Sequence, residues 1–206
     1  MIIDQDKRGL ARELFAKGCI KFGDFELKHG SHAPIYIDLR SVVSYPTLLT
    51  ALGERLGKLM SKLDFDVIAG LPYAGLPIAL ATSFASGWPM IYPRKEIKDY
   101  GTKKRVEGVY VSGQIAVVVD DVITDGGAKL ELIDPLLESG LIIRDVVVVV
   151  DRGQGGKEKL VAHGYKLHSI FTLRELVEFY RKERMTTEHE FRIAIKYLAT
   201  VDLAKP

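Results

Sequence analysis

The sequence predicts an α/β fold, with a mainly parallel central sheet that is covered by helices on both faces. The first observation is that short apolar runs alternate with segments of helical periodicity from residue 66 to residue 153. The second is that runs such as IAVVVDD (115–121) and DVVVVVDRG (145–153) are too continuously apolar to expose one face to water. Functional side chains are therefore expected at the C-terminal ends of these strands.

The N-terminal quarter predicts a helix, a strand pair and a second helix. Residues 4–18 place apolar side chains at helical spacing, and Gly18 is a plausible C-terminal stop. FELKHG (25–30) and PIYIDLR (34–40) flank a glycine-containing turn, which indicates a β-hairpin or two neighbouring strands. Helical periodicity returns over 45–63.

The rest of the chain follows in the same alternation. Strands are predicted at 66–70, 90–94, 115–121 and 145–153, and helices at 76–87 and from about 127 to 139. From Phe171 onward the chain is charged and helical, and RKERMTTEHE (181–190) reads as a linker between two helices.

Composition excludes several classes of protein. Lys and Arg total 29 against 27 for Asp and Glu, a net charge of +2, which is not the strongly basic balance of a nucleic-acid-binding protein. The single cysteine, Cys19, excludes an internal disulfide and a multi-cysteine zinc site, and it favours a reducing, cytosolic location. No apolar window of membrane-spanning length and no signal-peptide pattern occurs, so neither membrane insertion nor secretion is expected.

The stretch VVVDDVITDGGAK (117–129) carries the chemistry. A buried strand delivers Asp120 and Asp121 to a turn whose glycines, Gly126 and Gly127, open a helix with free N–H groups. Carboxylates beside an amide cup suit a phosphorylated sugar, with ribose hydroxyls or a water-bridged Mg²⁺ at the carboxylates. The structural alternative is a helix N-terminus capped by Thr124 or Asp125. The spacings of a P-loop and of a dinucleotide-binding motif are both absent.

Residues 92–108 are dense in charge and have no apolar face. A charge run of this kind is most often a solvated loop. Six cations within one segment between two predicted strands also suit a lid over an anionic ligand, namely Arg94, Lys95, Lys98, Lys103, Lys104 and Arg105.

Four segments together resemble one enzyme family. VVVDDVITDGG resembles the signature by which type I phosphoribosyltransferases bind phosphoribosyl pyrophosphate (PRPP). FELKHGSHAPIYIDLR is similar to the N-terminal segment of orotate phosphoribosyltransferases, and RKEIKDYGTKKRVEG looks like their catalytic loop. DRGQGGKEKLVAHGYKLHSIFTL resembles the segment after their last core strand, especially in bifunctional UMP synthases.

The resemblance implies a type I phosphoribosyltransferase fold formed by residues 1–206 as one domain. It implies a small N-terminal hood region over about 1–45, C-terminal helices over about 171–206 and a flexible lid loop. The implied reaction is Mg²⁺-dependent transfer of the 5-phosphoribosyl group from PRPP to orotate, which gives orotidine 5′-monophosphate and pyrophosphate in pyrimidine biosynthesis. A homodimer with lid residues shared between subunits, and a fused or associated orotidine 5′-monophosphate decarboxylase, are also implied. The alternatives are a phosphoribosyltransferase for another base and a non-catalytic PRPP-binding regulator.

Site residues follow from the matching positions. Those implied to be catalytic are Lys98, Asp120 and Asp121. Those implied to bind PRPP are Lys28, Tyr73, Arg94, Lys95, Lys98, Tyr100, Asp120, Asp121, Val122, Ile123, Thr124, Asp125, Gly126, Gly127 and Ala128. Those implied to bind orotate are Tyr36, Ile37, Thr124 and Arg152.

Several positions depart from the family pattern, among them His29 and Ala33, which stand where small hydroxyl residues are usual. Ala74 and Tyr100 stand where bacterial members often have a lysine and a histidine, as also happens in the UMP synthase branch. Asp125 places an extra carboxylate in the predicted phosphate cup, where it would repel a phosphate unless its side chain turned away. Lys129 is the candidate counter-charge.

Overall fold

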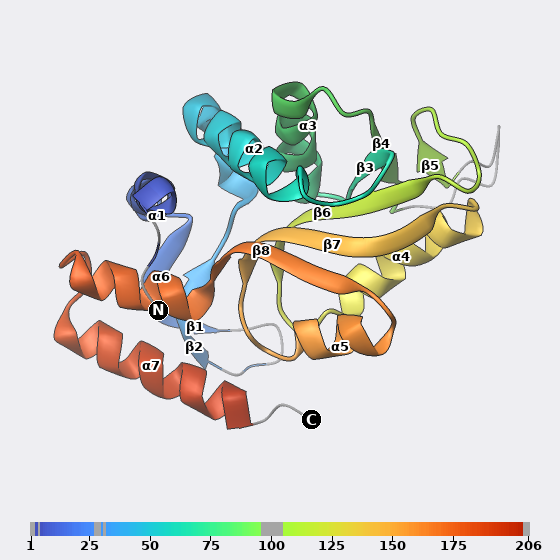
Figure 1. The fold of residues 1–206 in the computed structure, drawn as a ribbon. Coiled ribbons are helices and arrows are strands. Elements are labelled where there is room, and N and C mark those ends of the chain that lie inside the picture. Colours follow the sequence, from blue (N-terminus) through green and yellow to red (C-terminus); the bar gives the residue numbers. More distant parts are fainter. Residues whose placement is uncertain (1–2, 4, 27–29, 31, 96–104, 204–206) are drawn as a thin grey trace.

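A six-stranded sheet forms the centre of the molecule (Figure 1). The computed structural model describes residues 3, 5–26, 30, 32–95 and 105–203. The strands lie in the order β5-β4-β3-β6-β7-β8, and all neighbours are parallel except β4 and β5. They are β3 (Val67–Gly70), β4 (Met90–Pro93), β5 (Val106–Glu107), β6 (Ile115–Ile123), β7 (Ile142–Asp151) and β8 (Lys166–Thr172). The predicted mainly parallel sheet is confirmed.

Helices cover both faces of this sheet because its central strands are apolar on both sides. On one face, Val117 and Val119 of β6 join a core cluster with α2 (Pro46–Met60) and α3 (Gly75–Ser86). On the other face, Ala116 and Val118 join a second cluster with residues of α4 and α5. These helices are α4 (Gly127–Glu138) and α5 (Gly156–Ala162). Adjacent residues of one strand thus belong to different clusters, as the period of two requires.

The two ends of the chain form a second part beside the sheet. β1 (Ile20–Glu26) and β2 (His32–Ile37) make the predicted antiparallel hairpin. α1 (Gln5–Ala16), α6 (Leu173–Lys182) and α7 (Glu188–Leu203) surround it in Figure 1, and η1 (Arg40–Ser44) leads from the hairpin into α2. The buried Tyr180 hydroxyl of α6 donates a 2.9 Å hydrogen bond to the Ala11 carbonyl of α1, so the N-terminal and C-terminal helices are joined directly.

The prediction from the sequence was wrong for the segment that follows β7, which forms the β8 edge of the sheet. The predicted strand at 145–153, which corresponds to β7, is not the last strand of the sheet. α5 and then β8 follow β7 in the chain, and β8 pairs with β7. Phe171 belongs to β8, and the helix begins at Leu173, where Thr172 and Glu175 form a capping box. KLHSIFT mixes polar and apolar side chains because β8 is an edge strand, so it lacks the continuous apolar run of the inner strands. The linker between two helices is confirmed, since α6 ends at Lys182 and α7 begins at Glu188.

Among the described residues, no helix is both long enough and apolar enough to cross a lipid bilayer.

Candidate active site

The loop after β6 and the turn after β7 lie against each other at the C-terminal edge of the sheet. The Arg152 backbone N–H donates to the Ile123 carbonyl at 3.1 Å, and the Gly156 N–H donates to the Thr124 carbonyl at the same distance. A Cβ atom on Gly156 would lie 2.7 Å from the Thr124 carbonyl oxygen, so this contact requires glycine. Residues 124–128, the predicted phosphate cup, are therefore supported from beneath by the start of α5.

The cup itself leads into α4 without a side-chain cap. Gly126, at φ 81°, is the N-cap residue, and no side chain accepts a hydrogen bond in the capping position. Thr124 and Ala128 are exposed, while Gly126 is buried. Of the two predicted capping residues, Asp125 takes part of this role, because its Oδ1 accepts from the Gly127 N–H at 3.3 Å. The N-terminal end of α4 still presents its positive potential to an anion.

Asp120 and Asp121 occupy different environments although they are adjacent. Asp120 is buried, with one oxygen accepting from the Asp121 N–H at 2.8 Å and the other forming an ion pair with Lys129. Burial raises the pKa of Asp120, the Lys129 ammonium opposes that rise, and Asp121 adds to it. Asp121 is half-buried. Of the two, only Asp120 forms an ion pair within the described part of the chain.

Lys159 supplies a counter-charge for the Asp125 carboxylate, which the family pattern did not predict in the phosphate cup. The Lys159 ammonium of α5 lies 3.6 Å from Asp125 Oδ2, and the Gly127 N–H approaches Asp125 Oδ1 at 3.3 Å. The Asp125 side chain is 72% exposed, so it points away from the buried side of the loop. The prediction that Lys129 is the counter-charge of Asp125 is wrong, because that lysine pairs with Asp120. No local sequence pattern predicts that α5 brings Lys159 to this place.

The loop after β3 and the base of the charged segment form a hollow of about 280 Å³. Three residues predicted to bind PRPP line it, Tyr73, Arg94 and Lys95. The Lys95 ammonium lies 5.0 Å from the centre of the Tyr73 ring, and Arg94 pairs with Glu107 at 2.9 Å. The structure thus brings these three predicted residues together. Lys28, Lys98 and Tyr100 were also predicted, and they lie outside the described residues.

Arg152 has more buried polar atoms without a hydrogen-bond partner than any other residue in the described part of the chain. Its guanidinium Nε and Nη2 atoms are buried and have no hydrogen-bond partner among the described residues. The same is true of Gln154 Oε1, two residues further along. Burial lowers the pKa of Arg152, and the nearby Tyr197 hydroxyl acts in the opposite direction. Buried donors of this kind are normally paired with protein, water or a ligand, and Arg8 Nε and Thr186 Oγ1 are also buried without a partner among the described residues. Neither Gln154 nor Tyr197 was predicted from the sequence.

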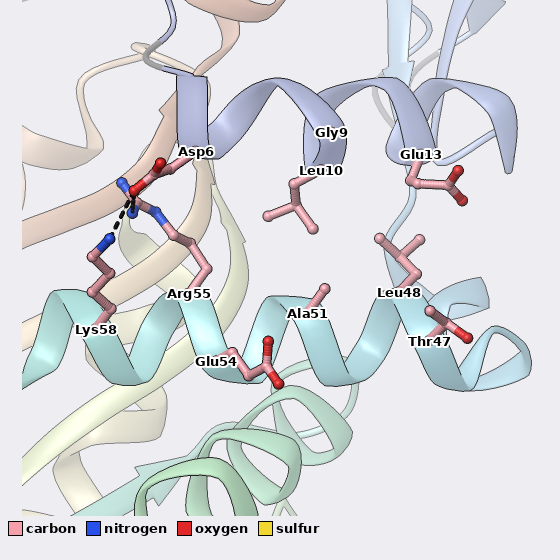
Figure 2. A pocket seen from close by; sticks show the side chains of 10 residues that line it. All are labelled: Asp6, Gly9, Leu10, Glu13, Thr47, Leu48, Ala51, Glu54, Arg55 and Lys58. Atoms are coloured by element: carbon pink, nitrogen blue, oxygen red, sulfur yellow. Dashed lines mark hydrogen bonds and ion pairs between the residues drawn. The ribbon is translucent and has the colours of Figure 1, made fainter.

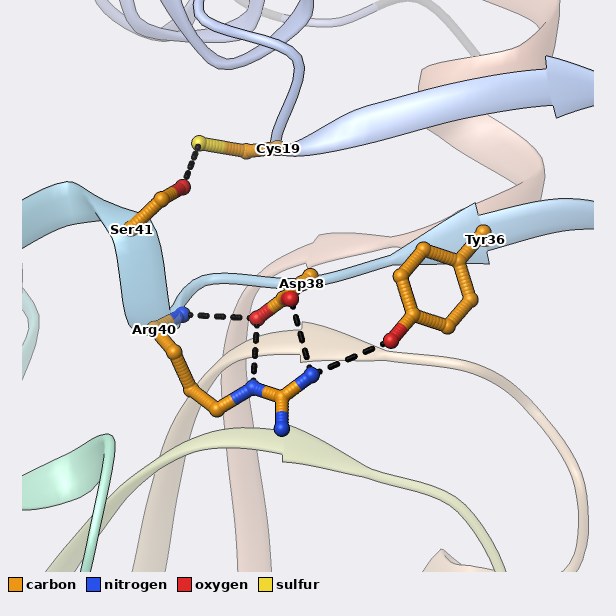
Figure 3. A network of polar contacts seen from close by, with 5 residues as sticks. All are labelled: Cys19, Tyr36, Asp38, Arg40 and Ser41. Carbon is orange, nitrogen blue, oxygen red and sulfur yellow. Dashed lines mark hydrogen bonds and ion pairs between the residues drawn. The ribbon is translucent and has the colours of Figure 1, made fainter. Parts of the chain in front are cut away.

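The hairpin positions the predicted base-pocket residues Tyr36 and Ile37 on β2 (Figure 3). The Tyr36 hydroxyl accepts a 3.0 Å hydrogen bond from Arg40, which is itself held by both carboxylate oxygens of Asp38 at 2.7 and 2.8 Å. The Tyr36 ring stacks on Phe25 of β1 with centroids 5.4 Å apart. Ile37 packs against the larger core cluster. Tyr36 is therefore fixed from two sides.

A second hollow, of about 430 Å³, lies between α1 and α2 (Figure 2). An ion pair between Asp6 and Lys58 at 2.7 Å closes one end of it. None of the described site residues predicted from the sequence lines this hollow. Within the described ranges, no group of three or more His, Cys, Asp or Glu side chains is arranged to hold a metal ion.

Comparisons with known proteins place the chain among enzymes of nucleotide synthesis. It is 39% identical over 191 residues to the orotate phosphoribosyltransferase of Pyrobaculum aerophilum, covering 92% of this chain and 98% of that protein. It is 40% identical over 166 residues to the uridine 5′-monophosphate synthase of Bos taurus, covering 80% of this chain and 35% of that protein. The chain spans 35% to 38% of the length of the bifunctional relatives that it matches. No family model matches it.

Solved structures give the same result. The UMP synthase of Leishmania donovani superposes with a TM-score of 0.87 at 38% identity, over 94% of this chain and 42% of that one. The orotate phosphoribosyltransferase of Mycobacterium tuberculosis in complex with 5-phospho-α-D-ribosyl 1-diphosphate superposes with a TM-score of 0.69 at 27% identity. That match covers 83% of this chain and 98% of the other.

Proposed function

Since the chain belongs to the orotate phosphoribosyltransferase family, we propose that it transfers the 5-phosphoribosyl group of PRPP to N1 of orotate. The products are orotidine 5′-monophosphate and pyrophosphate, and the reaction serves pyrimidine biosynthesis. The observation that carries the proposal is that two buried guanidinium atoms of Arg152, Nε and Nη2, have no partner among the described residues, in the turn that supports the phosphate cup. A guanidinium fork matches the two oxygens of a carboxylate, and orotate has a carboxylate where uracil has hydrogen.

The phosphate end of PRPP is assigned to the loop between β6 and α4. The N-terminal end of α4 and the nearby Lys159 ammonium supply positive potential there. Asp121 accepts hydrogen bonds from the ribose hydroxyls, and the buried Asp120 orders the backbone beneath it through the Asp121 N–H. Val122 and Ile123 contribute only backbone and packing to this arrangement.

The pyrophosphate end is assigned to the hollow lined by Tyr73, Arg94 and Lys95. As the bond to the anomeric carbon breaks, negative charge grows on the leaving pyrophosphate and positive charge grows on the ribose ring. Cations at the hollow stabilise the first charge, and the carboxylates at the end of β6 stabilise the second. We assign Lys98, Tyr100 and Lys28 to the same task on the strength of the family resemblance.

The carboxylates present fit a Mg²⁺ ion that arrives with PRPP. Mg²⁺ commonly binds substrate phosphates together with one or two protein carboxylates. Among the described residues, the nearby Lys129 pairs with Asp120 and leaves Asp121 to this role. When bound, Mg²⁺ neutralises charge on the leaving pyrophosphate. Asp121, directly or through water, is the residue that would hold it.

The assembly is proposed on the same basis. Several relatives are bifunctional proteins of greater length, and we propose that this domain, residues 1–206, works fused to or associated with an orotidine 5′-monophosphate decarboxylase. We further propose a cytosolic homodimer whose charged segment acts on the neighbouring subunit's site.

One assay tests the central proposal. Addition of PRPP and Mg²⁺ should remove the absorbance of orotate, and parallel reactions with hypoxanthine, adenine and uracil should remain unchanged. Arg152→Lys should lower kcat/KM for orotate by about a hundredfold, because a lysine keeps the charge but loses the two-pronged contact. Consumption of another base in place of orotate would show the proposal to be wrong.

A further inference from the structure

The surroundings of Arg152 define a ligand more closely than its charge alone. The two orphaned guanidinium atoms, Nε and Nη2, are both donors on one edge of the fork, so they require a planar pair of acceptor oxygens. The third orphaned atom, Gln154 Oε1, is an acceptor and requires an N–H or O–H donor. One ligand that satisfies all three atoms carries a pair of acceptor oxygens and a proton donor, as the carboxylate and ring N–H of orotate do. A fully ionised phosphate has only acceptors, and uracil has N–H groups but no carboxylate.

The orientation of the Gln154 amide is set by α7. Its Nε2 donates a 3.1 Å hydrogen bond to the Tyr197 hydroxyl, which leaves Oε1 as the end without a partner. Tyr197 is brought there because Ala194 and Leu198 on the same face of α7 are buried in the larger core cluster. The same hydroxyl lies close enough to the Arg152 guanidinium to influence it electrostatically. One phenol therefore meets both polar groups.

We propose that Gln154 recognises the pyrimidine base, its Oε1 accepting a hydrogen bond from N3–H, the ring N–H that keeps its proton through the reaction, while Arg152 pairs with the carboxylate. Tyr197 is a positioning residue that holds both side chains in the orientation that the base requires. This inference rests on the proposed function, and it adds two residues to the base subsite. It also gives α7 a direct role in substrate choice, although this helix is far in sequence from the cup.

Two substitutions test the inference in the full chain. Gln154→Met keeps the length of the side chain and removes the amide, and Tyr197→Phe keeps the ring and removes the hydroxyl. Each should raise KM for orotate about tenfold, the usual effect of losing one hydrogen bond to a buried polar group. KM for PRPP should stay within about twofold and kcat should change little, because the contact is made equally in the bound and transition states.

The controls separate a recognition role from a structural one. Tyr110→Phe removes a hydroxyl at the opposite end of the sheet and should leave both KM values unchanged. Direct calorimetric titration of orotate should reproduce the tenfold loss for the two test variants, and thermal melting should show that they remain folded. If wild-type protein consumes no orotate, the proposed function fails. If it does consume orotate and both test variants keep the wild-type KM, the function stands and this inference is overturned.

Discussion

At the scale of single residues, two of three neighbouring aspartates are each paired with a lysine, and the third is not. Lys129 of α4 pairs with the buried Asp120, and Lys159 of α5 lies beside the exposed Asp125. Asp121 remains as the carboxylate best placed to meet a ligand. An acidic cluster that would repel a phosphate is thereby made compatible with one, since each of the other two negative charges has a cation close by.

Replacing Lys129 with Met should show how strongly the buried carboxylate depends on its partner. Removal of one member of a buried ion pair costs about 3 kcal/mol, so the free energy of unfolding at pH 8 should fall by that amount in urea titrations. The matched control is Lys159→Met, whose partner carboxylate is 72% exposed and whose ion pair is worth less than about 1 kcal/mol.

The pH dependence of this variant follows from the direction of the pKa shift. Burial raises the pKa of Asp120 above its value in the unfolded chain, so the folded chain holds the proton more tightly. The contribution of Asp120 to stability is then greatest at acidic pH and falls as the pH rises from about 4, the usual carboxyl value. Without Lys129 the pKa rises further, and the loss of stability between pH 5 and pH 8 should be steeper than in the wild type. If the curves of unfolding free energy against pH run parallel in the variant and the wild type, this account of the Lys129–Asp120 pair is contradicted.

At the scale of elements, the contact between the cup and α5 depends on Gly156. An added Cβ would meet the Thr124 carbonyl and the Ile123 side chain, both at 2.7 Å. Gly156→Ala should therefore push the loop away, lower stability by about 2 kcal/mol, and raise KM for PRPP more than KM for orotate. Both values can be taken from one steady-state data set.

Gly9→Ala is the control for that substitution. Gly9 lies inside α1, and an added Cβ would meet nothing within 4 Å. The variant should be more stable by about 0.8 kcal/mol, because alanine has the higher helix propensity. If Gly156→Ala were equally harmless, the cup would not rely on this close approach.

The elements that the sequence predicted well are those with a strong periodic signal. β6 and β7 are apolar on both faces, and α2 has one clear apolar stripe, so their existence followed from period alone. β8 was missed because an edge strand mixes polar and apolar residues, and α5 was missed because it has only seven residues. Tyr197 could not be found, since nothing local links it to Gln154, 43 positions earlier. The aspartates were located correctly, but their ion-pair partners depend on tertiary packing.

At the scale of the whole molecule, the two chain ends are joined beside the sheet. The Tyr180 hydroxyl is fully buried and donates to the Ala11 carbonyl, while Arg12 pairs with Glu183 at the surface between the same two helices. Both contacts connect α1 with the region of α6. They differ in burial, and this difference makes their contributions separable.

Tyr180→Phe should lower the free energy of unfolding by about 1 kcal/mol, the net value of one buried hydrogen bond. Arg12→Gln should have a smaller effect, because its ion pair is open to solvent. Denaturant titrations of both variants and of the double variant give the comparison. A larger loss for Arg12→Gln would show that the surface pair, and not the buried hydroxyl, holds the ends together.

The placement of Tyr197 on α7 also bears on the order in which the parts of the site are synthesised. The strands that carry Asp121 and Arg152 are complete once β7 and its turn have emerged, before α7 has been made. The phenol that holds the Gln154 amide belongs to α7, which follows both of them in the chain. A nascent chain can therefore form the strand and turn that carry Asp121 and Arg152 before the side chain that holds Gln154 has been made.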